Sequence, residues 1–210
     1  MLDDPYPLLP DQIEHYRREG FVHLPEVFDA ATLAAFEPTL TRLTLENDPQ
    51  RGRRLTEKDL YGQAFIQVGN LWQMDAQARA FSFSKRLARI AAELMGTRGV
   101  RMYHDQALYK EAGGGFTPWH VDQQYWPLAS PHAITAWIPL HPVPLEQGPM
   151  AFGRRSHLRD IARDLEISAE SEAVICEQVQ RCGIDAYVQP YALGEVSFHA
   201  GWTLHRAGPN

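Results

Sequence analysis

The order of secondary-structure signals along the 210 residues constrains the fold more than any other feature of the sequence. The first half indicates mainly helices, with two short strands: helices at 11–19, 30–45 and between Ser84 and Gly96, strands at 21–24 and 64–68. The second half indicates short strands separated by turns rich in glycine and proline: 100–110, 132–140, 196–199 and 203–205. Helices followed by short strands are typical of an α+β protein with an antiparallel β-sandwich or barrel.

Three segments carry less regular signals. Pro38 is expected to kink or divide the helix at 30–45, because proline lacks the backbone N–H that continues the helical ladder. The charged segment 51–59 is expected to be a loop. Residues 158–181 are expected to form one or two helices that end at Gly183.

Composition places the chain among globular proteins of one domain. Apolar residues make up 44 % and charged residues 22 %, and the formal net charge of -6 argues against nucleic-acid binding. The first residues lack the basic and apolar segments of a signal peptide, and no stretch is apolar for long enough to cross a membrane. Cys176 and Cys182 are too few for a zinc site. We therefore expect a cytoplasmic protein that does not bind nucleic acid or cross a membrane.

The segment 118–122 carries the first candidate metal ligands. Side chains two positions apart on a strand point to the same side, so His120 and Asp122 are expected to face the interior together. With a second histidine they would complete a two-histidine, one-carboxylate triad, which favours iron(II) and leaves coordination positions open. Closed zinc sites with four protein ligands match this set less well. The spacing alone is a weak signal, because nine histidines give several opportunities for it.

His205 is the expected third ligand. It lies 85 residues after His120 (205 − 120), a separation that fits strands distant in sequence and adjacent in a sandwich. His199 is a rival, which we expect to pack or hydrogen-bond near the site instead. The other histidines considered are expected to be surface or structural residues: His15, His23, His132, His141 and His157.

Four blocks of sequence carry a more specific signal. In chain order they are HYRREGFVHLP at 15–25; DQALYK at 105–110 with TPWHVDQ at 117–123 and YWP at 125–127; TAWIPL at 135–140 with QGPMAF at 147–152 and Ser156-His157; and LHRAGPN at 204–210. Together the blocks resemble the phytanoyl-CoA dioxygenase family of iron(II)/2-oxoglutarate-dependent oxygenases. They occur in the family's order and span nearly the whole chain.

The resemblance implies a double-stranded β-helix, a cupin-like jelly roll, wrapped by N-terminal helices. It assigns Fe(II) to His120, Asp122 and His205. It also implies that 2-oxoglutarate and O2 are cosubstrates, with 2-oxoglutarate decarboxylated to succinate. The side chains expected to line the 2-oxoglutarate pocket are those of Gln106, Thr135, Trp137 and Gln67.

Two departures from the family pattern affect the expected site. Arg154 and Arg155 stand where relatives have Pro-Gly, so this turn is expected to differ. Relatives also carry an arginine about ten residues after the distal histidine, and its two parallel hydrogen bonds grip the far carboxylate of 2-oxoglutarate. The sequence ends at Asn210, before that position. The neighbouring Arg206 is expected to point away from the metal.

These observations lead to one expected domain organisation. Residues 1–210 are expected to form a single oxygenase domain. A mainly helical flank with the first strands occupies 1–98, and the jelly-roll core occupies 99–210, truncated at its C-terminus.

The expected activity is hydroxylation or desaturation of a small organic metabolite by a monomer or homodimer. Related halogenases replace the carboxylate ligand by a small residue, so Asp122 favours hydroxylation, desaturation or ring closure over halogenation. Tyr125, Trp126 and Phe116 are expected to line a substrate pocket, with core packing as the alternative. Two other functions stay open: a cupin-type metalloenzyme that does not use 2-oxoglutarate, and a truncated, non-catalytic ligand-binding jelly roll.

Overall fold

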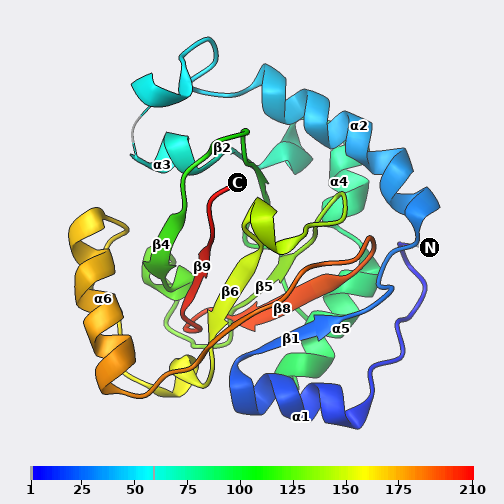
Figure 1. The fold of residues 1–210 in the computed structure, drawn as a ribbon. Coiled ribbons are helices and arrows are strands. Elements are labelled where there is room, and N and C mark those ends of the chain that lie inside the picture. The colour runs from blue at the N-terminus through cyan, green and yellow to red at the C-terminus, as the bar shows by residue number, and fades with distance from the viewer. Residues whose placement is uncertain (1, 59) are drawn as a thin grey trace.

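A computed structural model describes residues 2–58 and 60–210 and shows helices packed around antiparallel sheets (Figure 1). The helices are α1 (Pro10–Glu19), α2 (Ala30–Glu46), α3 (Leu60–Ala64), α4 (Ala76–Ser82), α5 (Lys85–Met95) and α6 (Ala169–Arg181). The strands are β1 (Phe21–Leu24), β2 (Ile66–Gly69), β3 (Gln106–Tyr109), β4 (Thr117–His120), β5 (Ile134–Trp137), β6 (Met150–Gly153), β7 (Ala186–Val188), β8 (Val196–Ala200) and β9 (His205–Ala207).

The strands form two principal sheets and a two-stranded ribbon. One sheet has the order β1-β8-β5, the other has the order β4-β9-β6-β7, and β2 pairs with β3. All the named pairs are antiparallel. The two principal sheets face each other, since the ring of Phe21 on β1 stacks on that of Phe152 on β6 at 4.6 Å between centroids. This arrangement confirms the predicted α+β jelly roll.

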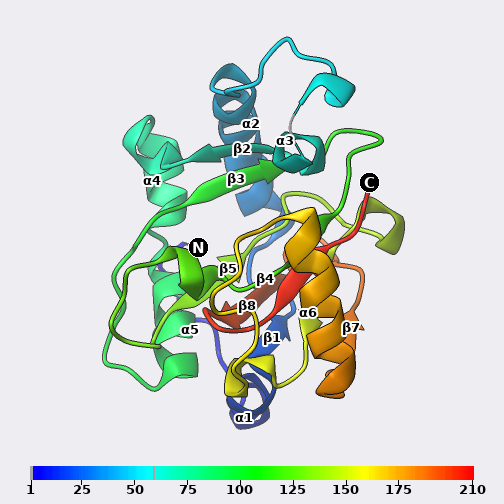
Figure 2. The same cartoon turned by 90° about the vertical axis from the view of Figure 1, so that its left-hand side faces the viewer.

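Helices cover both outer faces of this sandwich. Figures 1 and 2 place α2, α4 and α5 on one side and α6 on the other. The largest apolar core lies under the first group, where Leu33, Phe81 and Ile90 pack with Phe198 on the outer face of β8. A second core lies under α6, around Ile175. The third core lies between the sheets and contains the aromatic rings of Phe21, Phe152 and Tyr191.

Several predicted boundaries are confirmed and others are wrong. The α5 helix begins after Ser84, whose hydroxyl accepts from Leu87 N–H, and ends at Gly96 in the left-handed region. Helix α2 runs unbroken through Pro38, because the buried Leu33 and Leu40 anchor it on both sides of the proline.

In the second half, strand formation is more limited than predicted. Only 106–109 of the segment 100–110 and 134–137 of the segment 132–140 form strands, and the last strand is 205–207 instead of 203–205. Residues 159–168 are irregular, so only 169–181 of the segment 158–181 form an α-helix.

Two segments near residue 60 also differ from expectation. A short helix, α3, precedes β2, so the strand predicted at 64–68 begins at Ile66. The predicted loop 51–59 contains a 3₁₀ turn at Leu55–Glu57. Its last residue, Asp59, lies outside the described residues. Within the described chain, no helix is both long and apolar enough to cross a membrane.

The turn after β6 is fastened to the end of α1. Arg155 adopts φ 60°, its N–H donates to the Glu19 carbonyl at 2.9 Å, and its guanidinium lies 3.3 Å from the Glu19 carboxylate. The next residue, Ser156, accepts from Leu204 N–H at 2.8 Å through its buried hydroxyl. The turn therefore connects the first helix to the strand that carries His205.

Gly20, between α1 and β1, is required by both its conformation and its surroundings. Its φ is 89°, and a Cβ atom there would lie 2.4 Å from Nδ1 of His157 and 2.6 Å from Oγ1 of Thr203. Its carbonyl accepts from Ala200 N–H and from the Thr203 hydroxyl. Glycine is therefore needed at the junction that aligns β1 with β8.

Gly20→Ala should lower the free energy of unfolding by about 3 kcal/mol or more, because left-handed strain and steric overlap add. Gly183→Ala is the matched control: φ is 60° there, but nothing lies within 4 Å of the added Cβ. That control should cost only about 1 kcal/mol. Urea unfolding monitored by circular dichroism measures both values, and equal losses would show that crowding at Gly20 is unimportant.

Candidate metal centre

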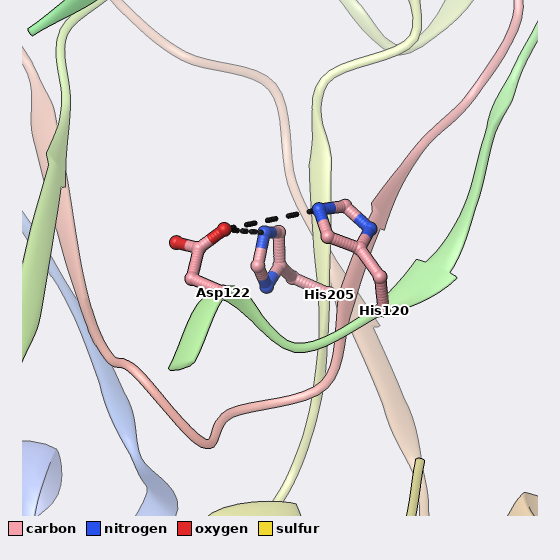
Figure 3. A group of neighbouring side chains, drawn as sticks. All are labelled: His120, Asp122 and His205. Atoms are coloured by element: carbon pink, nitrogen blue, oxygen red, sulfur yellow. Dashed lines mark ion pairs between the residues drawn. The ribbon is translucent and has the colours of Figure 1, made fainter. Parts of the chain in front are cut away.

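The three predicted metal ligands converge on one another (Figure 3). His120 ends β4, His205 begins β9, and Asp122 begins the 3₁₀ helix η3 (Asp122–Tyr125). Oδ1 of Asp122 lies 3.4 Å from Nε2 of His205 and 3.9 Å from Nε2 of His120. One ligand atom from each residue lies within 4.8 Å of the others, a spacing that suits a shared cation.

Asp122 reaches this site from just beyond the strand that was expected to carry it. Val121 remains extended (φ -125°, ψ 133°), so the alternation of side chains continues for one more step before the chain turns. Trp119 and Val121 accordingly face the core under α6, while His120 and Asp122 face inward.

Each histidine of the triad is oriented through its other ring nitrogen. Nδ1 of His120 lies 2.9 Å from the Pro118 carbonyl, and Nδ1 of His205 lies 3.0 Å from the Thr203 carbonyl. A carbonyl only accepts, so Nδ1 carries a proton as donor, and Nε2 is the ring nitrogen left to face the centre of the cluster. This is the arrangement that commonly holds metal-binding histidines.

The two oxygens of the Asp122 carboxylate have different partners. Oδ2 accepts from the Thr135 hydroxyl at 2.7 Å and lies 3.1 Å from Nε2 of the buried His199. Oδ1 is directed at the two histidines. His199 therefore hydrogen-bonds to the carboxylate, as expected, and His205 is the histidine that joins His120 and Asp122 in the cluster.

Electrostatics prepare the cluster for a cation. Burial lowers the pKa of His120 to about 3, so its ring is neutral near pH 7. Burial alone would raise the pKa of Asp122, but the charge of His205 and the hydrogen bonds from His199 and His205 hold it well below its usual value. Burial likewise opposes a charge on His205, but the Asp122 carboxylate raises its pKa. A divalent cation bound between Asp122 and His205 would replace the favourable charge interaction that raises the pKa of His205.

The donor set fits iron(II). Two imidazole nitrogens and one carboxylate oxygen are the ligands of the facial triad, and the carboxylate and both imidazoles have partners that fix their orientation. A closed structural zinc site would need a fourth protein ligand. The arrangement can hold a metal that keeps coordination positions for small molecules.

The four residues predicted to contact 2-oxoglutarate lie in three different parts of the fold. Trp137 lies inside the sandwich, with its ring 4.6 Å from that of Tyr191. Gln67 donates to Gln106 across the β2–β3 ribbon. Thr135 contacts Asp122 directly. Contact with 2-oxoglutarate therefore stays a prediction for all four residues.

The aromatic residues predicted to line a substrate pocket lie next to β4 but do not form one cluster. Tyr125 is exposed, and its hydroxyl accepts from Ile167 N–H at 2.7 Å. Trp126 packs against Tyr103 and His104, with ring centroids 5.7 and 5.8 Å away. Phe116 is exposed. Contact with a substrate stays a prediction for all three.

The structure identifies Asp122 as the shared partner of Thr135 and His199, which the sequence did not indicate. Thr135 and His199 pair across β5 and β8, which places both side chains on the inner face of the same sheet. Alternation along β8 alone would have placed His199 and Ser197 on one face. Nothing local in the sequence, however, shows that this face meets Asp122.

Comparisons with known proteins agree with this geometry. The phytanoyl-CoA dioxygenase family model matches residues 16–210. The non-heme alpha ketoglutarate dependent carbocyclase SnoK from nogalamycin biosynthesis is similar, with 28% identity, a TM-score of 0.81, and coverage of 99% of this chain and 81% of SnoK. The epimerase SnoN, in complex with Fe3+, alpha ketoglutarate and nogalamycin RO, shows 27% identity, a TM-score of 0.77, and coverage of 95% and 77%. A sequence comparison with curated proteins found no match.

Thr135→Val should weaken iron(II) binding by about tenfold, because it removes a hydrogen bond to Asp122 while keeping the side-chain shape. Anaerobic titration with iron(II), followed by titration with 2-oxoglutarate, separates the two affinities. Thr56→Val, at an exposed position, is the control. Unchanged iron affinity with weaker 2-oxoglutarate binding would instead make Thr135 a cosubstrate contact.

Proposed function

Because the chain belongs to the phytanoyl-CoA dioxygenase family and is a non-haem iron(II)/2-oxoglutarate-dependent dioxygenase, we propose that it hydroxylates a small organic metabolite. Fe(II), 2-oxoglutarate and O2 are its cofactor and cosubstrates. We infer that residues 1–210 act as one oxygenase domain. The observation that carries the proposal is the convergence of the half-buried His120 and Asp122 with the buried His205.

The proposed division of labour follows from the contacts of this cluster. His120 and His205 would hold iron through Nε2, and Asp122 would hold it through Oδ1. When bound, iron and 2-oxoglutarate supply the oxidising chemistry, with O2 consumed and succinate released. Thr135 and His199 keep Asp122 in place through Oδ2. The aromatic core around Phe21 and Phe152 limits the access of water from behind.

The carboxylate ligand supports hydroxylation over halogenation. A halide bound to iron would need the coordination position that the Asp122 carboxylate would take when it holds the metal. The Asp122 carboxylate has two further partners, so it is fixed in this position. Halogen transfer is therefore not part of the proposal.

Ring closure is the second candidate reaction, and a specific relative favours it. SnoK is a carbocyclase and is similar over nearly the whole of this chain. Hydroxylation adds one oxygen atom to the substrate, whereas oxidative ring closure removes two hydrogen atoms. Mass spectrometry of the product distinguishes the two reactions once a substrate that stimulates succinate release has been found.

Asp122→Ala should abolish iron-dependent binding of 2-oxoglutarate and the substrate-coupled release of succinate. In the unaltered protein, anaerobic addition of iron(II) and 2-oxoglutarate should produce the visible charge-transfer band of chelated 2-oxoglutarate. The variant should lack this band. Asp160→Ala removes an exposed carboxylate and should keep it. A folded Asp122→Ala protein with an unchanged band would contradict the assignment of Asp122 as a ligand.

A further inference from the structure

Helix α6 lies on the outer face of the two strands that carry the histidines of the triad (Figures 1 and 2). Ile175 of this helix is buried against Trp119, Val121 and Leu204. Each of these three residues is the immediate neighbour of a residue in the triad. The helix therefore supports the metal centre from behind, although it supplies no ligand.

Within α6, we propose that Glu172 is a positioning residue that holds β4 and β9 together behind the metal centre. Its Oε2 accepts from the backbone N–H of Trp119 at 2.6 Å. Its Oε1 lies 3.6 Å from the guanidinium of Arg206. The guanidinium in turn lies over the Trp119 ring, 4.9 Å from its centroid. One carboxylate thus contacts both strands, next to His120 on one and next to His205 on the other.

The contact occurs where the pairing of the two strands is irregular. Thr117 pairs with Ala207, and His120 pairs with His205. Three steps along β4 therefore correspond to two steps along β9, which is the signature of a β-bulge. Bulges redirect side chains, and this one sets the direction of His120 and of the turn that carries Asp122. Glu172 accepts from Trp119 N–H within this irregular step.

The chemistry of the group also indicates a specific role. Only 16% of the Glu172 side chain is exposed, and it lies beside an apolar core. A partly buried carboxylate is stable there only when it is paired and hydrogen-bonded. Without it, the N–H of the buried Trp119 loses an acceptor and Arg206 loses its partner. The bulge is then free to shift, and metal sites are sensitive to small displacements of their ligands.

This inference rests on the proposed function, since it concerns the same metal centre. We expect Glu172→Ala to weaken iron(II) binding 10- to 100-fold, the range typical of residues that orient ligands. Glu172→Gln retains an oxygen for Trp119 N–H but loses the charge that pairs with Arg206, so its loss should be smaller. Glu177→Gln, exposed on the same helix, is the matched control and should match the unaltered protein.

Two readouts separate positioning from general stability. The dissociation constant for iron(II) is measured anaerobically, and the ligand-field spectrum of bound cobalt(II) reports the geometry of the ligands. Urea unfolding of the metal-free variants measures stability alone. We expect a weaker, altered cobalt spectrum in Glu172→Ala that Glu172→Gln partly restores.

Unchanged metal affinity and spectrum in a folded Glu172→Ala protein would overturn the inference, as would a loss of stability without any change at the metal. If Glu172→Ala does not fold, Glu172→Gln decides, and metal affinity equal to that of Glu177→Gln overturns the inference. Failure of the unaltered protein to bind iron(II) would instead contradict the proposed function. The two failures are therefore distinguishable.

Discussion

The Asp122 carboxylate is the group on which the site depends, because its two oxygens are committed to opposite sides. One oxygen is tied to the sheet that contains β5 and β8, through Thr135 and His199. The other faces the histidines that begin and end strands of the opposing sheet. A single short side chain thus couples the two halves of the sandwich. Any change in the distance between the sheets would alter the metal centre directly.

The apolar layers explain how that distance is kept. Phe21 and Phe152 stack between the sheets, and Phe152 also approaches the ring of His199 at 5.4 Å. Aromatic rings are rigid and have few rotamers, so they maintain a fixed spacing. Outside the sandwich, α5 and α6 bury the opposite faces of the strands. The ligands are polar groups held in place by packing on both sides.

The fold could be predicted well where local chemistry decides. Ser84 and Gly96 bound α5 because capping depends on neighbouring residues alone. The alternation of side chains placed His120 and Asp122 on one side, although Asp122 lies past the end of β4. The assignment of His205 as the third ligand rested on a separation that fits distant strands and on the resemblance to the family, because nothing local connects residues 85 positions apart.

The features that the sequence did not reveal depend on tertiary contacts or on a local turn. The bulge in β4 and the role of Glu172 depend on a helix that packs from a distant part of the chain. The last strand begins two residues later than predicted because Thr203 N–H closes a turn onto the Ala200 carbonyl. Periodicity in one sequence carries no information about which partner lies opposite a strand.

The turn at Arg155 has a consequence for how this sequence can vary. A non-glycine residue in the left-handed region is disfavoured by about 1 kcal/mol, and here an ion pair with the nearly buried Glu19 offsets that cost. Glycine at this position would relieve the strain and lose the ion pair. The hydrogen bond from Leu204 N–H to the Ser156 hydroxyl does not involve the side chain of residue 155. Residues 154 and 155 can therefore differ from the Pro-Gly of relatives while Ser156 still holds the backbone next to His205.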